Sequence, residues 1–128
     1  MADAHTRFEA FCDLFYRQKR VRAAFEAHVV PDYLQHSTGM AQGREAAILA
    51  LEPMFARPAF RITPLRTLWD GDLSSVILHV RVGDAVEAVV VDIFRHGSGG
   101  IVEHWDVKAE LDLQQRQHYF DGLTPRVR

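Results

Sequence analysis

The periodicity of the chain changes after residue 60, and this change limits the possible folds more than any other sequence feature. Apolar and polar side chains alternate through segments near 60–69, 73–82, 85–95 and 101–108, separated by the turn sequences WDGD, VGD and HGSGG. Strict alternation is typical of strands, and short turns join strands that run antiparallel. The second half of the chain is therefore predicted to form an antiparallel meander.

Helical spacing dominates the residues before this meander. An apolar stripe starts at Phe8 and repeats at i, i+3, i+4 and i+7 as far as His28, interrupted by a basic stretch. Pro31 lacks a backbone donor, so the region should end by about Val30, as one bent helix or two short ones. A brief strand over 32–38 and a third helix over 44–55 follow. Helices first and strands afterwards predict an α+β fold, with the helices packed on one side of the sheet.

Length and composition limit the class of protein. At 128 residues the chain fits one domain, expected to span 1–128. The formal charge of −2 and scattered basic residues give no stripe for nucleic acid phosphates, so no nucleic acid partner is expected. Cys12 is the only cysteine, which excludes an intrachain disulfide. No apolar run approaches the ~18 residues that span a bilayer. We expect a cytoplasmic protein without membrane contacts.

The strand VEAVVVDIFR contains one residue that does not fit an ordinary core, Asp92. A carboxylate between Val90 and Phe94 cannot lose its hydration cheaply, so it must be paired, hydrogen-bonded or protonated. A structural interpretation is a buried acid that caps a turn or pairs with Arg81. The functional interpretation is a reactive group in a pocket, with Val90 and Phe94 contacting the substrate.

The next strand brings two more polar side chains to the same face. If Arg95 lies opposite Ile101, Asp92 lies directly across from His104, and a two-residue slip would bring Asp106 opposite instead. Either register keeps all three side chains together, and only a bulge would separate them. We predict Asp92, His104 and Asp106 as catalytic residues; the alternative for the last two is a structural hydrogen-bonded pair.

Such a group suits acid–base chemistry on a carbon acid. A carboxylate in a dry pocket can remove a proton beside a carbonyl group while a nearby donor stabilises the enolate oxygen. Tyr33 and His36 are predicted to supply such donors, His36 as a catalytic residue and Tyr33 as a substrate-binding one. A histidine satisfied by backbone groups at a strand end is the structural alternative for His36.

The opposite face of these two strands is too apolar to remain in water. It carries Val89, Val91, Ile93, Trp105 and Val107. We predict that this face packs against a second subunit in a homodimer. Parity assigns Trp105 to the same face, although a bulge at the turn would bring it into the cavity as a substrate-binding wall.

Two segments, VVVDIFRHGSGGIVEHWDV and YLQHSTGMAQGREA, resemble the C-terminal hairpin and the pocket strand of SnoaL-like polyketide cyclases, members of the nuclear transport factor 2-like superfamily. The resemblance covers nearly the whole chain in order. It implies a cone-shaped α+β barrel of the cystatin-like type, usually dimeric, around a deep apolar cavity. The characterised cyclases close a ring by intramolecular aldol condensation without metal or cofactor, using an aspartate as acid and base.

The resemblance also assigns residues by position. Asp106 matches the catalytic aspartate of the family, and Asp92 matches the partner of that aspartate on the preceding strand. His36 matches the polar residue of the first strand. His104 and Trp105 lie in the EHWD motif itself. The chain departs from the family in two places. The partner is a histidine in the characterised cyclases, and many relatives have Asn-Pro where this chain has the Ser-Thr pair at 37–38.

These observations predict a cofactor-independent acid/base enzyme that acts on a small apolar carbonyl compound by aldol-type cyclisation, isomerisation or dehydration. The alternative is a domain of the same fold that binds a small hydrophobic ligand without catalysis or serves as a dimeric scaffold. His36, His104, Asp92 and Asp106 could ligate a metal. No tight motif such as HExxH is present, and family precedent is against a metal, so none is expected.

Overall fold

The computed structural model describes residues 3–123, so residues 1–2 and 124–128 of the expected domain lie outside the described part. The helices are α1 (Ala4–Cys12), α2 (Val21–His28), α3 (Arg44–Phe55) and α4 (Leu113–Tyr119), with a π-helical turn at Asp13–Arg17. The strands are β1 (Val29–Gln35), β2 (Phe60–Asp70), β3 (Leu73–Val82), β4 (Val86–Gly97) and β5 (Gly100–Glu110). No helix within 3–123 has the length and apolar character needed to cross a membrane.

The sheet has the strand order β1-β5-β4-β3-β2, and β2 to β5 form the predicted antiparallel meander. β1 runs parallel to β5 at the edge of the sheet. The strand expected at 32–38 begins earlier, at Val29, because α2 ends at His28 and the chain extends at once. Pro31 is compatible with this position because an edge strand needs no ladder donor on its free side.

The N-terminal region consists of two short helices, one of the two predicted forms. Between them the backbone widens into a π-helical turn, in which the backbone N–H of Gln18 donates to the Asp13 carbonyl oxygen at 2.9 Å. Lys19 then takes a left-handed conformation, with φ of 56°, and ends the turn. The successive residues Phe15 and Tyr16 are both buried, and Tyr16 is only 1% exposed.

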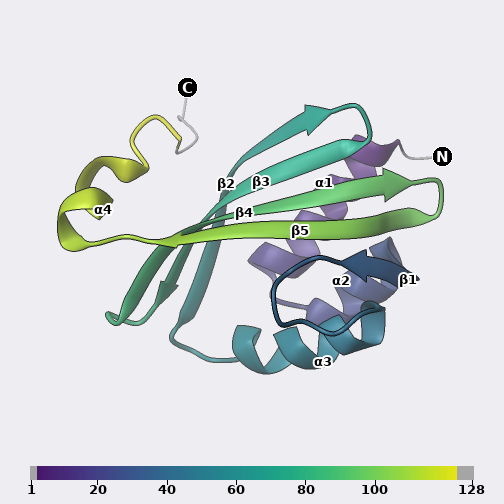
Figure 1. Cartoon of the computed structure of the whole chain (residues 1–128), viewed down its shortest axis with the longest axis horizontal. Helices are drawn as coiled ribbons and strands as arrows, with labels where there is room; N and C mark the ends of the chain where they lie inside the picture. The colour runs from purple at the N-terminus through teal and green to yellow at the C-terminus, as the bar shows by residue number, and fades with distance from the viewer. Residues whose placement is uncertain (1–2, 124–128) are drawn as a thin grey trace.

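Helices α1 to α3 lie on one side of the strongly curved sheet, and the core fills the space between them (Figure 1). The core is rich in aromatic side chains, including Phe8, Phe11, Phe15, Phe25, Phe55, Phe60 and Phe94. The short helix α4 follows β5 at the opposite end of the sheet (Figure 1). Arg116 of α4 contacts Glu87 at 3.2 Å, and Phe120, which follows α4, stacks on His79 at 4.1 Å between ring centroids.

The β4–β5 hairpin uses the slipped register. Asp92 lies opposite Asp106 rather than His104, which lies opposite Phe94, so the first predicted register is wrong. The expected loop of five residues is in fact a tight turn between the paired Gly97 and Gly100. A bulge next to this turn shifts the pairing, but it lies beyond the acidic residues and leaves their common face intact.

Candidate active site

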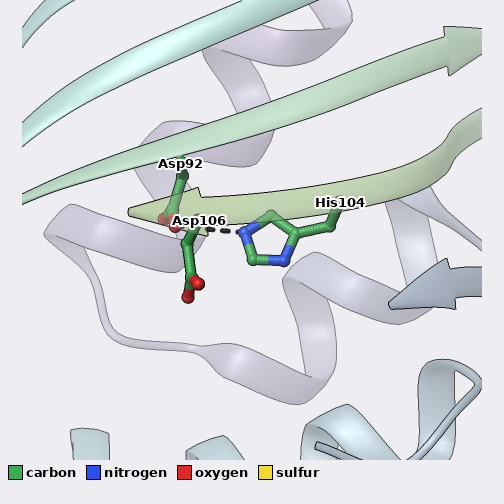
Figure 2. A group of neighbouring side chains, drawn as sticks. All are labelled: Asp92, His104 and Asp106. Atoms are coloured by element: carbon green, nitrogen blue, oxygen red, sulfur yellow. Dashed lines mark hydrogen bonds and ion pairs between the residues drawn. The ribbon is translucent and has the colours of Figure 1, made fainter. Parts of the chain in front are cut away.

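A cavity of about 600 Å³ lies between the inner face of the sheet and the helices. Most of its wall is apolar, including Phe15, Phe25, Val29, Leu51, Phe60, Ile62, Val80 and Ile101. Asp92 of β4 and His104 and Asp106 of β5 also line it. Figure 2 shows these three side chains converging from neighbouring strands, as the shared parity of the two strands predicts.

Asp92 is buried and has a partner on each carboxylate oxygen. The Tyr16 hydroxyl donates to Oδ2 at 2.6 Å, and His104 Nε2 lies 3.0 Å from Oδ1. Asp92 is 8% exposed and His104 is 9% exposed. The sequence predicted that a carboxylate here must be paired or hydrogen-bonded, and the structure provides both partners.

The contact of His104 Nδ1 shows which ring nitrogen of His104 carries a hydrogen. Nδ1 is 2.7 Å from Gln35 Oε1, which also accepts from the Ser37 amide at 3.0 Å. Because an amide oxygen only accepts, Nδ1 must carry a hydrogen. The contact between Nε2 and Asp92 then holds one further hydrogen, carried either by the imidazole or by the carboxyl group. A hydrogen bond between the two residues therefore needs a hydrogen that either of them can carry.

Asp106 is exposed at one side of the cavity, and no hydrogen bond or ion pair to Asp106 occurs among residues 3–123. One ligand atom each of Asp92, His104 and Asp106 lies within 4.8 Å of the others, so these residues could hold a metal ion. Every buried polar side-chain atom in the described part of the chain already has a hydrogen-bond partner. Each of these atoms thus has at least one partner without a cation, and the expectation of a metal-free site stays a prediction.

Sequence reasoning missed Tyr16 and Gln35. Burial, followed by the charge of Asp92, raises the pKa of Tyr16 well above its ordinary value, so the hydroxyl remains a donor. The helical stripe ended at Phe15, and the π-helical turn brings the next residue inward too. Two features of the sequence could have identified Tyr16. The buried Asp92 needs a hydrogen-bond donor, and Tyr16 is a tyrosine inside an apolar helical region.

Tyr33, Phe94 and Val90 line the cavity as expected, while their role in substrate binding stays a prediction. Burial raises the pKa of Tyr33 to about 12. Its hydroxyl oxygen accepts a hydrogen bond from Gln35 Nε2 at 2.8 Å. Gln35 therefore touches both His104 and Tyr33.

His36 does not line the cavity, contrary to expectation, because its side chain lies on the outer side of the sheet, and Trp105 lies on that side too, as strand parity predicted. His36 Nε2 is 2.6 Å from Glu103 Oε2, and its ring stacks on Trp105 with centroids 4.9 Å apart. β1 directs Gln35 inward, so the next residue points outward. Trp105 keeps the outward parity because the bulge lies nearer the turn.

A family model described as a SnoaL-like domain matches residues 8–104, which is most of the chain. The chain belongs to the SnoaL-like family. No curated protein matches the sequence. Family membership agrees with the resemblance of the hairpin and pocket-strand motifs.

Solved structures agree on the fold. A nuclear transport factor 2-like protein of unknown function from Cytophaga hutchinsonii is 12% identical with a TM-score of 0.70, covering 93% of this chain and 96% of that one. IdmH of Streptomyces antibioticus, a candidate polyketide cyclase, is 18% identical with a TM-score of 0.66, covering 84% and 92%. An LEH-like epoxide hydrolase of M. tuberculosis is 20% identical with a TM-score of 0.62, covering 83% of this chain and 82% of that one. These likenesses confirm the predicted nuclear transport factor 2-like fold of the family member.

Proposed function

We propose that this SnoaL-like protein is a cofactor-independent acid/base enzyme acting on a small apolar carbonyl compound. One observation carries the proposal: Asp92 and His104 form a hydrogen-bonded contact inside an apolar cavity, beside the Asp106 carboxylate, which has no hydrogen bond or ion pair among residues 3–123. Buried acid–base pairs in a cavity are typical of sites that transfer protons. The cyclase and epoxide hydrolase neighbours support the same class of chemistry.

The geometry favours a division of roles. Asp106 has no partner among the described residues, so its carboxylate is available to remove a proton from the carbon beside a carbonyl group. The C–H electron pair moves to form an enolate, and the proton passes to an Asp106 oxygen. The hydrogen shared by Asp92 and His104 then neutralises the developing oxygen anion. Aldol-type cyclisation, isomerisation and dehydration can all begin with this step.

Exchange of deuterium into a simple ketone tests the proposal. In deuterated water, the protein should accelerate replacement of the hydrogens beside the carbonyl of 1-indanone, followed by proton NMR. Asp106→Asn and Asp92→Asn should each slow this exchange roughly 100-fold or more, as expected for loss of a general acid or base. Glu103→Gln, on the outer face, is the matched control and should exchange at the wild-type rate. Wild-type exchange in both Asn variants would contradict the proposal.

The alternative is a domain that binds a hydrophobic ligand without turnover. The apolar cavity favours it equally, since cavities of 300–1,000 Å³ suit small molecules in general. Binding of 1-indanone and related apolar ketones without accelerated exchange in any of them would support this alternative and remove the enzyme proposal.

We also propose a cytoplasmic homodimer formed through the outer face of the sheet. Leu68 of β2 and Val107 of β5 are 57% and 63% exposed, an arrangement that a second copy would cover. Val107→Glu should shift the mass measured by light scattering toward that of a monomer. Leu49→Glu is the control, because Leu49 is 62% exposed on α3, away from this face. Equal masses for all three proteins would contradict the dimer.

A further inference from the structure

Gln35 occupies a position from which one side chain controls two groups of the cavity. It is 4% exposed, and its Oε1 accepts from His104 Nδ1 at 2.7 Å while its Nε2 donates to the Tyr33 hydroxyl at 2.8 Å. The Ser37 amide donates to the same Oε1, which fixes the orientation of the side-chain amide. A rotated amide would place two donors face to face at 3.0 Å.

The backbone of Gln35 is held equally firmly. Its amide donates to Gln42 Oε1 at 2.9 Å, and its carbonyl oxygen accepts from Gln42 Nε2 at 2.7 Å. The Gln42 side chain thus pairs with the end of β1 much as a neighbouring strand would. Both the position and the orientation of the Gln35 amide are therefore set before any ligand enters.

This orientation leaves the hydroxyl hydrogen of Tyr33 without a protein acceptor. The oxygen already accepts from Gln35, and the structure shows no second hydrogen bond from this hydroxyl to an acceptor among residues 3–123. Tyr33 is 2% exposed and lines the cavity. Its raised pKa, about 12 through burial, keeps the hydroxyl protonated at any ordinary pH. A buried donor in the wall of an apolar cavity contributes most to binding a ligand that brings an acceptor.

We propose that Gln35 is a positioning residue, which holds the Tyr33 hydroxyl as a donor for a carbonyl oxygen of the ligand and holds the hydrogen of His104 on Nδ1. The inference rests on the proposed function for the class of ligand. It adds where the carbonyl oxygen lies and which residue prepares that place. The carbonyl oxygen accepts from the Tyr33 hydroxyl in addition to the hydrogen shared by Asp92 and His104, and the carbon that loses a proton faces Asp106.

Two probes that differ by one oxygen atom test the ligand contact. The dissociation constants of 1-indanone and of the hydrocarbon indane are measured by NMR titration, and their ratio is compared between variants. Tyr33→Phe removes the donor, and Gln35→Glu gives the Tyr33 hydroxyl an acceptor within the protein. Each should lower the relative preference for the ketone about fivefold, the value of one ordinary hydrogen bond. Glu103→Gln, on the outer face of the sheet, is the control and should change the ratio less than twofold.

The same titrations separate the possible failures. An unchanged ratio in Tyr33→Phe, an equal change in Tyr33→Phe and Glu103→Gln, or no ketone binding by the wild type would overturn the proposal. A ratio that responds as expected, in a protein that never accelerates deuterium exchange, would support the binding contact while removing the enzyme. Thermal melting of each variant identifies any that fail to fold, and the conservative Tyr33→Phe then decides.

A second readout tests positioning independently of ligand. Nitrogen-15 NMR of the His104 ring should show a hydrogen on Nδ1 in the wild type and in Gln35→Glu, because both side chains accept there. Gln35→Met offers no acceptor, so the hydrogen should redistribute between the two ring nitrogens. An unchanged His104 spectrum in the folded Gln35→Met variant would overturn the positioning role, which a merely space-filling glutamine would not have.

Discussion

The inner and outer sides of the sheet each carry a histidine–carboxylate contact, and the two differ mainly in their surroundings. On the inner side, His104 and Asp92 lie 3.0 Å apart with side chains 11% and 12% exposed. On the outer side, His36 and Glu103 lie 2.6 Å apart with side chains 41% and 18% exposed. Distance alone would rank the outer contact as the stronger one.

Surroundings reverse that ranking. The outer contact lies beside water and adjoins a second ion pair, between Arg95 and Glu103, so other partners can replace each of its members. Exposed pairs of this kind contribute little to stability. The inner contact is fixed at both ends, by Tyr16 on Asp92 and by Gln35 on His104. Polar interactions in such a site are stronger, and an unpaired member is more costly.

The largest expected effect comes from removing the inner carboxylate. Asp92→Ala leaves the Tyr16 hydroxyl and one nitrogen of His104 without a partner, and should lower the free energy of unfolding by about 3 kcal/mol. Glu103→Ala on the outer side is the matched change and should cost less than about 1 kcal/mol. Urea unfolding of both variants measures the difference. Equal losses would mean that burial does not distinguish the two contacts.

The residues of the inner face could be predicted from the sequence. The side of the sheet to which a side chain points depends on the alternation along its strand, not on the exact pairing with the neighbouring strand. Asp92, His104 and Asp106 share a face in either pairing, so an error of two residues in the hairpin did not matter. The error itself came from loop length. A glycine-rich stretch is compatible with several turns, and Gly100 at φ of 132°, against the carbonyl of His28, is a tertiary constraint.

The missed residues depend on backbone irregularities rather than on pattern. Tyr16 enters the site through a π-helical turn, which helical spacing does not anticipate. His36 was misplaced because it lies three residues after Tyr33, and a strand that directs Tyr33 inward directs Gln35 rather than His36 to the same side. Gln35 has an ordinary sequence context, and only the structure reveals its contacts with His104 and Tyr33.

A second, smaller effect should follow from removing the donor to Asp92. Tyr16→Phe keeps the ring packing and deletes only the hydroxyl, which donates at 2.6 Å to the buried acid. The expected loss is about 2 kcal/mol, the range for hydrogen bonds to charged groups. Tyr119→Phe is the control, because that side chain is 45% exposed, and it should be neutral. A loss of less than about 0.5 kcal/mol for Tyr16→Phe would show that water replaces the hydroxyl.

A third histidine, His96, should make the free energy of unfolding depend on pH. It is half-buried and lies at the turn end of β4. Burial, with the charge of Arg7, lowers its pKa to about 4. Between pH 6.5 and 4 the unfolded chain therefore takes up a proton that the folded protein does not. Stability should fall by about 1–2 kcal/mol as the pH drops through this window and should change little from this residue above it.

The variant His96→Phe isolates this contribution. It keeps an aromatic ring near Phe8 and Trp69 but has no group to protonate. Urea unfolding between pH 7 and 4 should show a shallower fall than the wild type. Some slope should remain, since burial also lowers the pKa of His28. An identical slope would mean that the His96 ring is protonated as readily in the folded protein as in the unfolded chain.

The smallest expected effect belongs to the outer contact and separates its two components. His36→Ala removes the contact with Glu103 and the stack on Trp105, and should cost less than about 1 kcal/mol in 0.1 M salt. At 1 M salt the screening length is only about 3 Å, so the electrostatic share should decrease while the stacking share remains. A loss above about 2 kcal/mol that ignores salt would place this contact in an environment as dry as the inner one. The exposed face would then be covered in solution, and a loss that grew with protein concentration would identify the cover as a second copy of the chain.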